Sequence, residues 1–362
     1  MQSLFSRLFP APRYLRLPTV GLDISDRAIK YAELVDDHNK LHLGKFGEVE
    51  IPEGAIKDGV ILDQDKLANI IGLIKKDTGL NTFHISLPEE KAYLVEMEVP
   101  AGARDLHTAI ELHLEEHVPL EVGSTIFDYE IAHRPEESDK NTFVVAVSAL
   151  EDHIAREYAE VLGKAGCKAF SFEFESQALA RAVISRGAAN VTMIVDIGRE
   201  QSDVSIVSRG VVRLTSSISL GGNTISRAIS EDLKISFEEA NKLKEKEGLD
   251  RRGQERSPFD SIVRVAAILR DEIYQRLIYW DNGRARSNNK DVVSRIVLCG
   301  GNANVPGLLE YLTSGTKVPV SIGNPWVNIL SFNESVPAIT SRESLKYCTA
   351  LGLALRSAHN QT

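Results

Sequence analysis

The stretch VGLDIS at residues 20–25 is an apolar run that ends in an acidic turn, and IVDIG at residues 194–198 repeats the pattern. In both, an aspartate stands at the tip of a predicted buried strand, and the backbone N–H groups of a turn follow it. A carboxylate beside such N–H groups suits a magnesium ion and the phosphates that accompany it. A third stretch, IVLCGG at residues 296–301, ends in two glycines, which allow a flat ligand to approach the backbone closely. The three turns therefore predict two lobes that face each other across one nucleotide.

The two lobes are predicted to be related by duplication, because the strand meander of residues 19–50 recurs at residues 191–218. Within the first lobe, alternating segments on either side of a helix predict an inserted β-β-α-β-β unit, so the fold class is α/β. The predicted units are an N-terminal tail (1–18), a first lobe (19–84 and 150–190), the inserted subdomain (85–149), a second lobe (191–235 and 291–362) and a helical subdomain of the second lobe (236–290).

Composition argues against several classes of function. The 362 residues include 42 Lys plus Arg and 51 Asp plus Glu, a net charge of −9 that disfavours nonspecific binding of nucleic acid. The three cysteines, Cys167, Cys299 and Cys348, form no CxxC pair, which indicates a reducing compartment without a disulfide framework or structural zinc. No apolar run reaches the length of about 18 residues expected of a transmembrane segment.

The N-terminal tail leaves two interpretations open. Leu4, Phe5, Leu8 and Phe9 line one face of a short predicted helix. Residues 1–12 then offer a weak contact to a membrane surface or a partner, or they fold back onto the domain as an ordinary chain terminus.

Charge at the two acidic turns is the strongest indication of function. A carboxylate at a sheet edge that faces a cleft can hold hydrated magnesium, so Asp23 and Asp196 are the predicted metal ligands. Either aspartate alone is also explained as a capping residue at a strand-to-turn junction, but the duplication makes that explanation weaker. The predicted nucleotide-binding residues are Asp23, Ser25, Lys30, Asp196, Gly198, Gly221, Gly222, Glu239, Lys242, Gly300, Gly301 and Asn302.

Some of these assignments have ordinary structural alternatives. Glu239 and Lys242 lie on a predicted helix rich in Lys and Glu, where a solvated face is the simpler explanation. Glu175, between a strand and a helix near the junction of the lobes, is the candidate catalytic residue, and its alternative is a helix-capping glutamate. Neither GxxxxGKS, GxxxxGKT nor GxGxxG occurs, which argues against P-loop and Rossmann chemistry.

Further stretches carry a family resemblance. They are LPE at 87–89, VPL at 118–120, AGCK at 165–168, ESQALAR at 175–181 and LGLALR at 351–356. Together with the nucleotide turns, they resemble the PilM family of type IV pilus assembly proteins, from about Val20 to Arg356. The resemblance implies an actin-like, ribonuclease H-like two-lobe ATPase fold, shared with the cell-division protein FtsA. It also implies ATP and magnesium in the cleft and a water-orienting role for Glu175.

The same resemblance implies a partner and a location. Members of the family act as cytoplasmic adaptors at the inner face of the inner membrane. There they bind the N-terminal cytoplasmic peptide of a bitopic PilN-like protein and join other pilus platform proteins. A related type II secretion platform, an FtsA-like or filament-forming role and a sugar-kinase-like enzyme stay open as alternatives. Because the chain stops soon after Arg356, without an FtsA-like membrane helix, we expect the PilM family.

The chain departs from the family pattern by extra charge at both turns. The family usually reads DIG followed by small hydroxyl residues, whereas Asp26 follows the first turn here, and Glu200 and Asp203 follow the second. Negative charge beside a triphosphate weakens its binding unless magnesium or Arg199 compensates it. We therefore expect nucleotide binding with at most slow hydrolysis.

Overall fold

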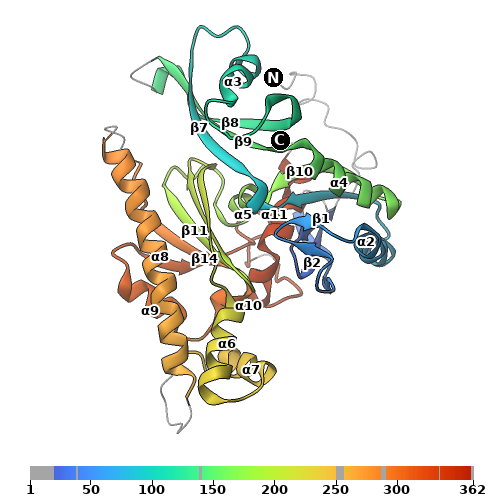
Figure 1. The fold of residues 1–362 in the computed structure, drawn as a ribbon, viewed down its shortest axis with the longest axis vertical. Helices are drawn as coiled ribbons and strands as arrows, with labels where there is room; N and C mark the ends of the chain where they lie inside the picture. The colour runs from blue at the N-terminus through green and yellow to red at the C-terminus, as the bar shows by residue number, and fades with distance from the viewer. Residues whose placement is uncertain are drawn as a thin grey trace.

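Two five-stranded mixed sheets with the same arrangement of strands form the two lobes of the computed structural model (Figure 1). The strands of the first sheet are β1 (Val20–Ile24), β2 (Ala28–Asp37), β3 (Lys40–Glu50), β6 (Thr82–Leu87) and β10 (Lys168–Phe174). Those of the second sheet are β11 (Thr192–Ile197), β12 (Ser202–Ser208), β13 (Val211–Ile218), β14 (Arg295–Cys299) and β15 (Val320–Ile322). The orders are β10-β6-β1-β2-β3 and β15-β14-β11-β12-β13. In each sheet the central strand pairs antiparallel with the next strand and parallel with a later one, which confirms the predicted duplication.

The structure describes residues 20–359, except 38–39, 138–140, 250–256, 287–290 and 334. The predicted N-terminal tail and its expected contact with a membrane surface therefore lie outside the described residues. Among the helices that are described, none is both long and apolar enough to cross a bilayer.

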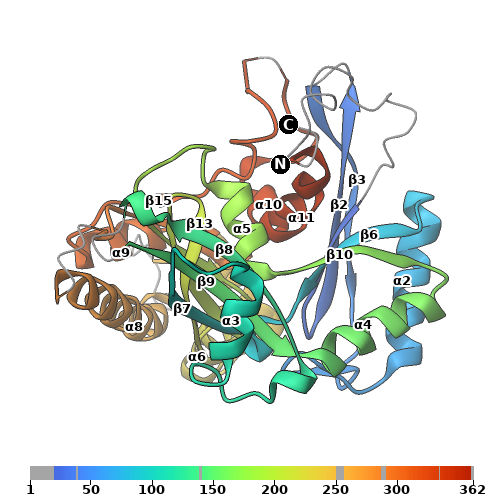
Figure 2. The same cartoon turned by 90° about the horizontal axis from the view of Figure 1, so that it is seen from above.

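The first sheet has helices on both faces. These helices are α2 (Gln64–Thr78), α4 (Asp152–Lys164), α5 (Glu175–Val183) and α11 (Cys348–His359). All five residues of β1 are buried, as expected for the central strand of a sheet covered on both sides. α2 and α4 cover the outer face, whereas α5 and α11 lie between the two sheets (Figure 2). On α2, Leu67, Ile71 and Ile74 are almost completely buried, and each contributes about 2 kcal/mol by leaving water.

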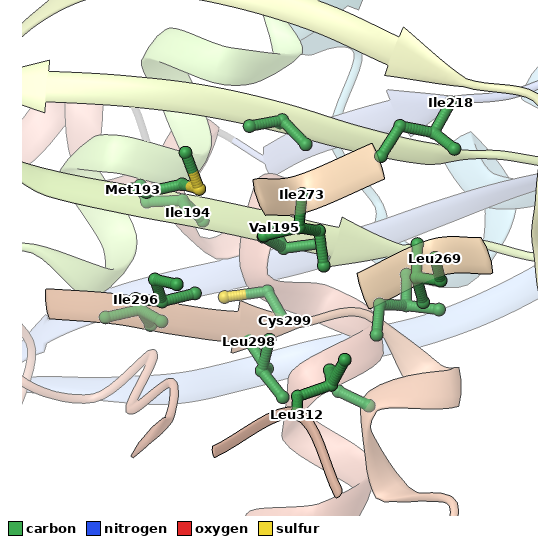
Figure 3. Close-up of a cluster of buried hydrophobic side chains, with 14 of the residues drawn as sticks. Met193, Ile194, Val195, Ile218, Leu269, Ile273, Ile296, Leu298, Cys299 and Leu312 are labelled. Atoms are coloured by element: carbon green, nitrogen blue, oxygen red, sulfur yellow. The ribbon is translucent and has the colours of Figure 1, made fainter. Parts of the chain in front are cut away.

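The second lobe carries the helical part of the chain. Its helices are α6 (Gly222–Leu233), α7 (Phe237–Lys246), α8 (Phe259–Arg286), α9 (Leu308–Gly315) and the short α10 (Ser341–Ser344). Val195 of β11 and Leu298 of β14 belong to one apolar cluster with Leu269 and Ile273 of α8 (Figure 3). The tips of β11 and β14 are therefore held on a rigid, fully buried layer.

The inserted unit is a three-stranded sheet with one helix. It consists of β7 (Tyr93–Pro100), α3 (Leu106–Leu114), β8 (Thr125–His133) and β9 (Thr142–Glu151), in the strand order β7-β9-β8. Two short strands, β4 (Ile56–Lys57) and β5 (Val60–Ile61), form a separate hairpin. The unit has its own apolar core, in which Ile110 and Leu114 of α3 pack against Val145 and Val147 of β9.

The predicted β-β-α-β-β composition of this unit is wrong in its first strand, because β6 pairs with β1 and β10 in the sheet of the first lobe. The alternation of apolar and polar residues in β6 resembles a half-exposed strand, but His84 and Ser86 are buried. The ring nitrogens of His84 lie 2.6 Å from the hydroxyl oxygens of Ser171 and Ser357. Ser86 accepts a hydrogen bond from the backbone N–H of Ile24. Polar side chains satisfied in this way can occupy a central strand.

Candidate functional site

The carboxyl ends of β1 and β11 carry Asp23 and Asp196, the two predicted metal ligands. Lys30, opposite Asp23 on β2, places its Nζ 3.6 Å from Asp23 Oδ2. Burial by itself would lower the pKa of Lys30, but attraction to carboxylates that include Asp23 and Asp196 outweighs burial and raises that pKa. The structure therefore brings the two acidic tips and Lys30 into one electrostatic cluster between the lobes.

The two aspartates differ in their surroundings. Burial raises the pKa of Asp23, and Lys30 offsets part of that effect. Asp196 stands opposite Asp203 in the register of β11 and β12. Burial raises the pKa of Asp196 to about 7; Lys30 lowers it in part, and the charge of Asp203 raises it further. Asp203, which appeared in the sequence only as unexpected charge, is thus a neighbour of the predicted metal ligand.

Glu175, the candidate catalytic residue, is the first residue of α5 and directly follows β10. Burial raises its pKa well above the usual range, and the carboxylates of Asp23 and Glu90 add to the shift. A raised pKa favours the protonated form of the Glu175 carboxyl group, and that form cannot accept a proton as a general base.

The backbone around the second tip is closely packed. Gly300 has φ +81°, and a Cβ atom there would lie 2.3 Å from Asp196 Oδ1. Gly300 therefore requires glycine, whereas a Cβ atom on Gly222 would lie 2.0 Å from Asn302 Oδ1 and would have to displace the Asn302 side chain. Asn302 Nδ2 donates to the carbonyl oxygen of Gly198 at 2.8 Å. These four predicted nucleotide-binding residues therefore lie together beside Asp196.

Three further predicted residues belong to the turns themselves. Ser25 donates both its backbone N–H and its hydroxyl to the carbonyl oxygen of Ala28, each at 3.0 Å. Gly221 is the N-cap of α6, and Gly301 begins a turn of 3₁₀-helix at Gly301–Asn304. Gly221 and Gly301 directly neighbour Gly222 and Gly300 in sequence, and Ser25 lies two residues after Asp23.

Lys244 is a site residue that sequence reasoning missed. Its Nζ donates to Asn302 Oδ1 at 2.9 Å and to the carbonyl oxygen of Gly222 at 3.2 Å. Burial lowers the pKa of Lys244 to about 8. The available signal was helical spacing, because Lys244 lies one turn after Ala240 on the buried face of α7.

Glu239 and Lys242 lie on the exposed side of α7. Glu239 completes a capping box with Ser236, and Lys242 Nζ lies 2.8 Å from Glu238 Oε1. The structure does not bring either side chain into the cluster around Asp196. Their contact with a nucleotide stays a prediction.

Much of the unexpected negative charge is compensated locally. The carboxylate of Asp26 accepts the backbone N–H groups of Asp58, at 2.7 Å, and of Gly59, at 3.1 Å, and so faces the β4–β5 hairpin. Glu200 lies 3.1 Å from Arg227 and 3.7 Å from Arg27. The extra charge at the two turns is therefore less of an obstacle to an anionic ligand than the sequence alone indicates.

Arg199 joins the two lobes by an ion pair. Its Nη2 lies 2.7 Å from Glu48 Oε1 on β3, and Lys346 Nζ lies 3.1 Å from Glu48 Oε2. Burial raises the pKa of Glu48, but its bond to Lys346 and the charge of Arg199 outweigh burial and lower it. Arg199 is thus engaged with a carboxylate of the first lobe.

The donor set fits magnesium bound together with phosphate. In the described part of the chain, no three Asp, Glu, His or Cys side chains form a group that could hold a metal ion. Magnesium is usually held by one or two carboxylates while substrate phosphates and water complete its shell. Asp196 and Asp203 supply carboxylate oxygens of that kind, and Lys30 supplies a positive charge for phosphate. Two surface cavities, of about 450 and 250 Å³, are lined by residues outside this cluster.

Comparison with known proteins identifies the family. The family model described as type IV pilus assembly protein PilM matches residues 21–358. The chain belongs to the PilM family. A solved structure of a PilM–PilN type IV pilus biogenesis complex is similar, with a TM-score of 0.77, 21% identity and coverage of 94% of this chain and 99% of that one.

More distant structures share the fold of this PilM family member. The ethanolamine utilization protein EutJ of Carboxydothermus hydrogenoformans gives a TM-score of 0.53 at 16% identity, covering 94% of this chain and 89% of that one. MreB5 of Spiroplasma citri bound to ADP gives a TM-score of 0.55 at 14% identity, covering 95% and 97%. The predicted actin-like α/β fold is thereby confirmed, and membership of the PilM family gives the chain a role in type IV pilus assembly.

Proposed function

We propose that this chain binds ATP with magnesium between its lobes and serves as a cytoplasmic adaptor of the pilus platform at the inner face of the inner membrane. Its inserted unit would hold the N-terminal cytoplasmic peptide of a PilN-like inner-membrane protein. The observation that carries the nucleotide part is the meeting of Asp23, Lys30 and Asp196 at the tips of two duplicated sheets. The titles of two similar structures support the proposal, since one contains PilN and another contains ADP.

Different residues of the cluster would bind the magnesium ion, the phosphates, and the base or ribose. Asp196, with Asp203 beside it, would hold magnesium, which neutralises phosphate charge when bound. Lys30 would contact phosphate, and the packed turn of Gly300 and Asn302 would accept the base or ribose. Glu175 would be at most a group that orients water, because its raised pKa favours the protonated form over the carboxylate that a general base requires. Hydrolysis is therefore expected to be slow.

The partner peptide is proposed to lie between β8 and β10. Both strands are edges of their sheets, β8 in the inserted unit and β10 in the first lobe. Ile126 of β8 is 41% exposed and Phe170 of β10 is 54% exposed, so apolar surface is available on both sides. Glu130 of β8 is close enough to Arg181 and Arg356 of the first-lobe side for their charges to lower its pKa, although burial raises it overall. A free edge can take up an extended peptide by strand addition, with side-chain pockets that supply specificity.

Calorimetry tests the nucleotide part of the proposal. Asp196→Ala is expected to remove most of the affinity for ATP in the presence of magnesium. The matched control is Asp65→Ala, which removes a carboxylate that is exposed on α2 and paired with Lys164. Unchanged affinity in Asp196→Ala would overturn the assignment.

Capture of the PilN-like peptide on a sensor surface tests the partner part. Phe170→Glu is expected to weaken capture strongly, because it places charge on the apolar side of the proposed groove. Leu112→Glu is the control, since Leu112 is 75% exposed on α3. Point substitutions are preferable to deleting residues 85–149, because residues 85–87 belong to the main sheet. Equal capture by both variants would refute this placement of the peptide.

A further inference from the structure

The inserted unit belongs to the first lobe by sequence but is fastened to the second lobe by a buried ionic network. Arg213 lies on β13, and its side chain is 1% exposed. Its Nε donates to Glu96 Oε2 of β7 at 2.8 Å, and its Nη2 donates to the same oxygen. Two N–H groups of one guanidinium therefore engage one carboxylate across the boundary between the unit and the second lobe.

A second contact of the network comes from the other edge strand of the unit. His133 Nε2 on β8 lies 3.3 Å from Arg213 Nη1 and 3.4 Å from Asp291 Oδ2. Asp291 precedes β14, and its Oδ2 lies 4.0 Å from Arg213 Nη1. The same oxygen accepts a hydrogen bond from the hydroxyl of Ser208 at 3.4 Å. Both edge strands of the unit, β7 and β8, thus contact the same cluster of the second lobe. We name Arg213, Glu96, His133 and Asp291 the clamp.

Apolar packing and chain connection agree with this arrangement. Leu94 of β7 packs against the core of the second lobe, whereas Leu150, at the end of β9 where the chain leaves the unit, belongs to the core of the first lobe. The chain enters the unit through residues 88–92, a segment of loop and 3₁₀-helix, and leaves it at Glu151. Breaking a buried ion pair leaves an uncompensated charge and is strongly unfavourable, so the clamp resists separation of the unit from the second lobe.

We propose that the clamp makes the inserted unit move with the second lobe, so that the nucleotide state of the cleft sets the width of the groove between β8 and β10. This inference rests on the proposed function, because it joins the nucleotide cleft to the peptide groove. Two rigid bodies that rotate about a few connecting residues form a hinge, and here residues 88–92 and Glu151 are the connections. Each ligand would then change the affinity of the other by the same factor.

Distances between spin labels test the motion directly. The native cysteines are buried, so Asn69→Cys on α2, Glu111→Cys on α3 and Gln275→Cys on α8 can be labelled selectively in pairs. Addition of magnesium and the non-hydrolysable analogue AMP-PNP is expected to change the distance from 111 to 69 and to leave the distance from 111 to 275 unchanged. A change only in the distance from 111 to 275, or in neither distance, would overturn the proposal.

Clamp variants test the cause. Glu96→Gln keeps the size of the side chain and removes its charge, and Arg213→Met removes the cation. Both are expected to broaden the distribution between 111 and 275, even without nucleotide. Arg264→Met is the control, because Arg264 is 59% exposed and pairs with Asp232 within the second lobe. Sharp distributions in folded Glu96→Gln protein would contradict the clamp.

Peptide binding separates this inference from the proposed function. In the wild type, AMP-PNP with magnesium is expected to change the Kd of the PilN-like peptide by at least about fivefold, and the factor should approach one in Glu96→Gln. Failure of the wild type to bind AMP-PNP or the peptide would overturn the proposed function and this inference with it. If both ligands bind but neither changes the affinity for the other, the proposed function stands and the clamp mechanism is refuted.

Discussion

The tips of β1 and β11 have the same backbone arrangement and opposite electrostatics. Each strand ends in an aspartate, pairs antiparallel with the next strand and pairs parallel with a later one. The residue opposite Asp23 is Lys30, whereas the residue opposite Asp196 is Asp203. Duplication has kept the frame while the two register partners have acquired opposite charges.

Two equivalent tips with unlike charges suit a ligand whose two ends differ in charge. At the first tip, the charge of Lys30 balances that of Asp23. Lys30 is also the positive group that can interact with phosphate. The second tip has excess negative charge, which raises the pKa of Asp196 and favours a divalent cation. We therefore expect phosphate to be held mainly at the first tip and magnesium mainly at the second.

The largest expected effect is on the stability of the first tip. Lys30→Met leaves the buried carboxyl group of Asp23 without its partner, so the free energy of unfolding should fall by about 3 kcal/mol in urea denaturation at pH 8. Lys66→Met removes the lysine of an exposed pair with Asp63 and should cost less than about 0.5 kcal/mol. Equal losses in the two variants would show that Asp23 does not depend on Lys30.

The second tip should make stability depend on pH. The pKa of Asp196 is about 7 in the fold and 3.8 in its reference state, so the folded protein holds a proton that the unfolded chain releases. The contribution of Asp196 to the free energy of unfolding is largest below pH 3.8. This contribution decreases as pH rises and is lost as pH passes through 7. Between pH 5 and 8, the free energy of unfolding of the nucleotide-free wild type should fall by about 1–2 kcal/mol relative to that of Asp196→Asn. This energy allows for the partial exposure of Asp196. Parallel pH profiles would contradict the prediction.

Removing the like charge at the second tip should stabilise it. Asp203→Asn keeps one acceptor oxygen, Oδ1, for the hydroxyl of Ser217 and the amide of Gln201, so its main effect is the loss of repulsion with Asp196. We expect the free energy of unfolding to rise by about 1 kcal/mol at pH 8, close to the free energy that corresponds to a shift of one pKa unit. A loss of stability in thermal and urea unfolding would mean that the hydrogen bonds of Asp203 outweigh its charge.

The smallest expected effects are on nucleotide affinity and come from Lys244, which contacts Asn302 beside the second tip. Lys244→Met removes the donor that fixes Asn302, and the affinity for ATP with magnesium should fall about threefold, the low end of one hydrogen bond. Lys242→Ala should leave that affinity unchanged, because its side chain pairs with Glu238 at the surface. Calorimetry that reverses this order would restore Lys242 as the nucleotide contact.

Sequence reasoning succeeded where local pattern decides the structure. The duplicated strand-to-turn pattern was enough to place Asp23 and Asp196 at equivalent tips. It could not give the register partners, since the pairing of Asp196 with Asp203 depends on alignment across two strands. Helical spacing places Lys244 on the same face as Ala240, but the many exposed lysines and glutamates of that helix obscured this signal. β6 was misplaced because its polar residues are buried by distant hydrogen-bond partners, which a local pattern does not reveal.

Calorimetry at pH 8 can separate the roles of the two tips by measuring how much magnesium increases the affinity for AMP-PNP in the wild type, Asp23→Asn and Asp196→Asn. If the second tip holds the cation, magnesium should strengthen binding in the wild type and in Asp23→Asn, and the gain should disappear in Asp196→Asn. If magnesium still increases the affinity in Asp196→Asn, or if the increase is lost in Asp23→Asn instead, the assignment of magnesium to the second tip is wrong.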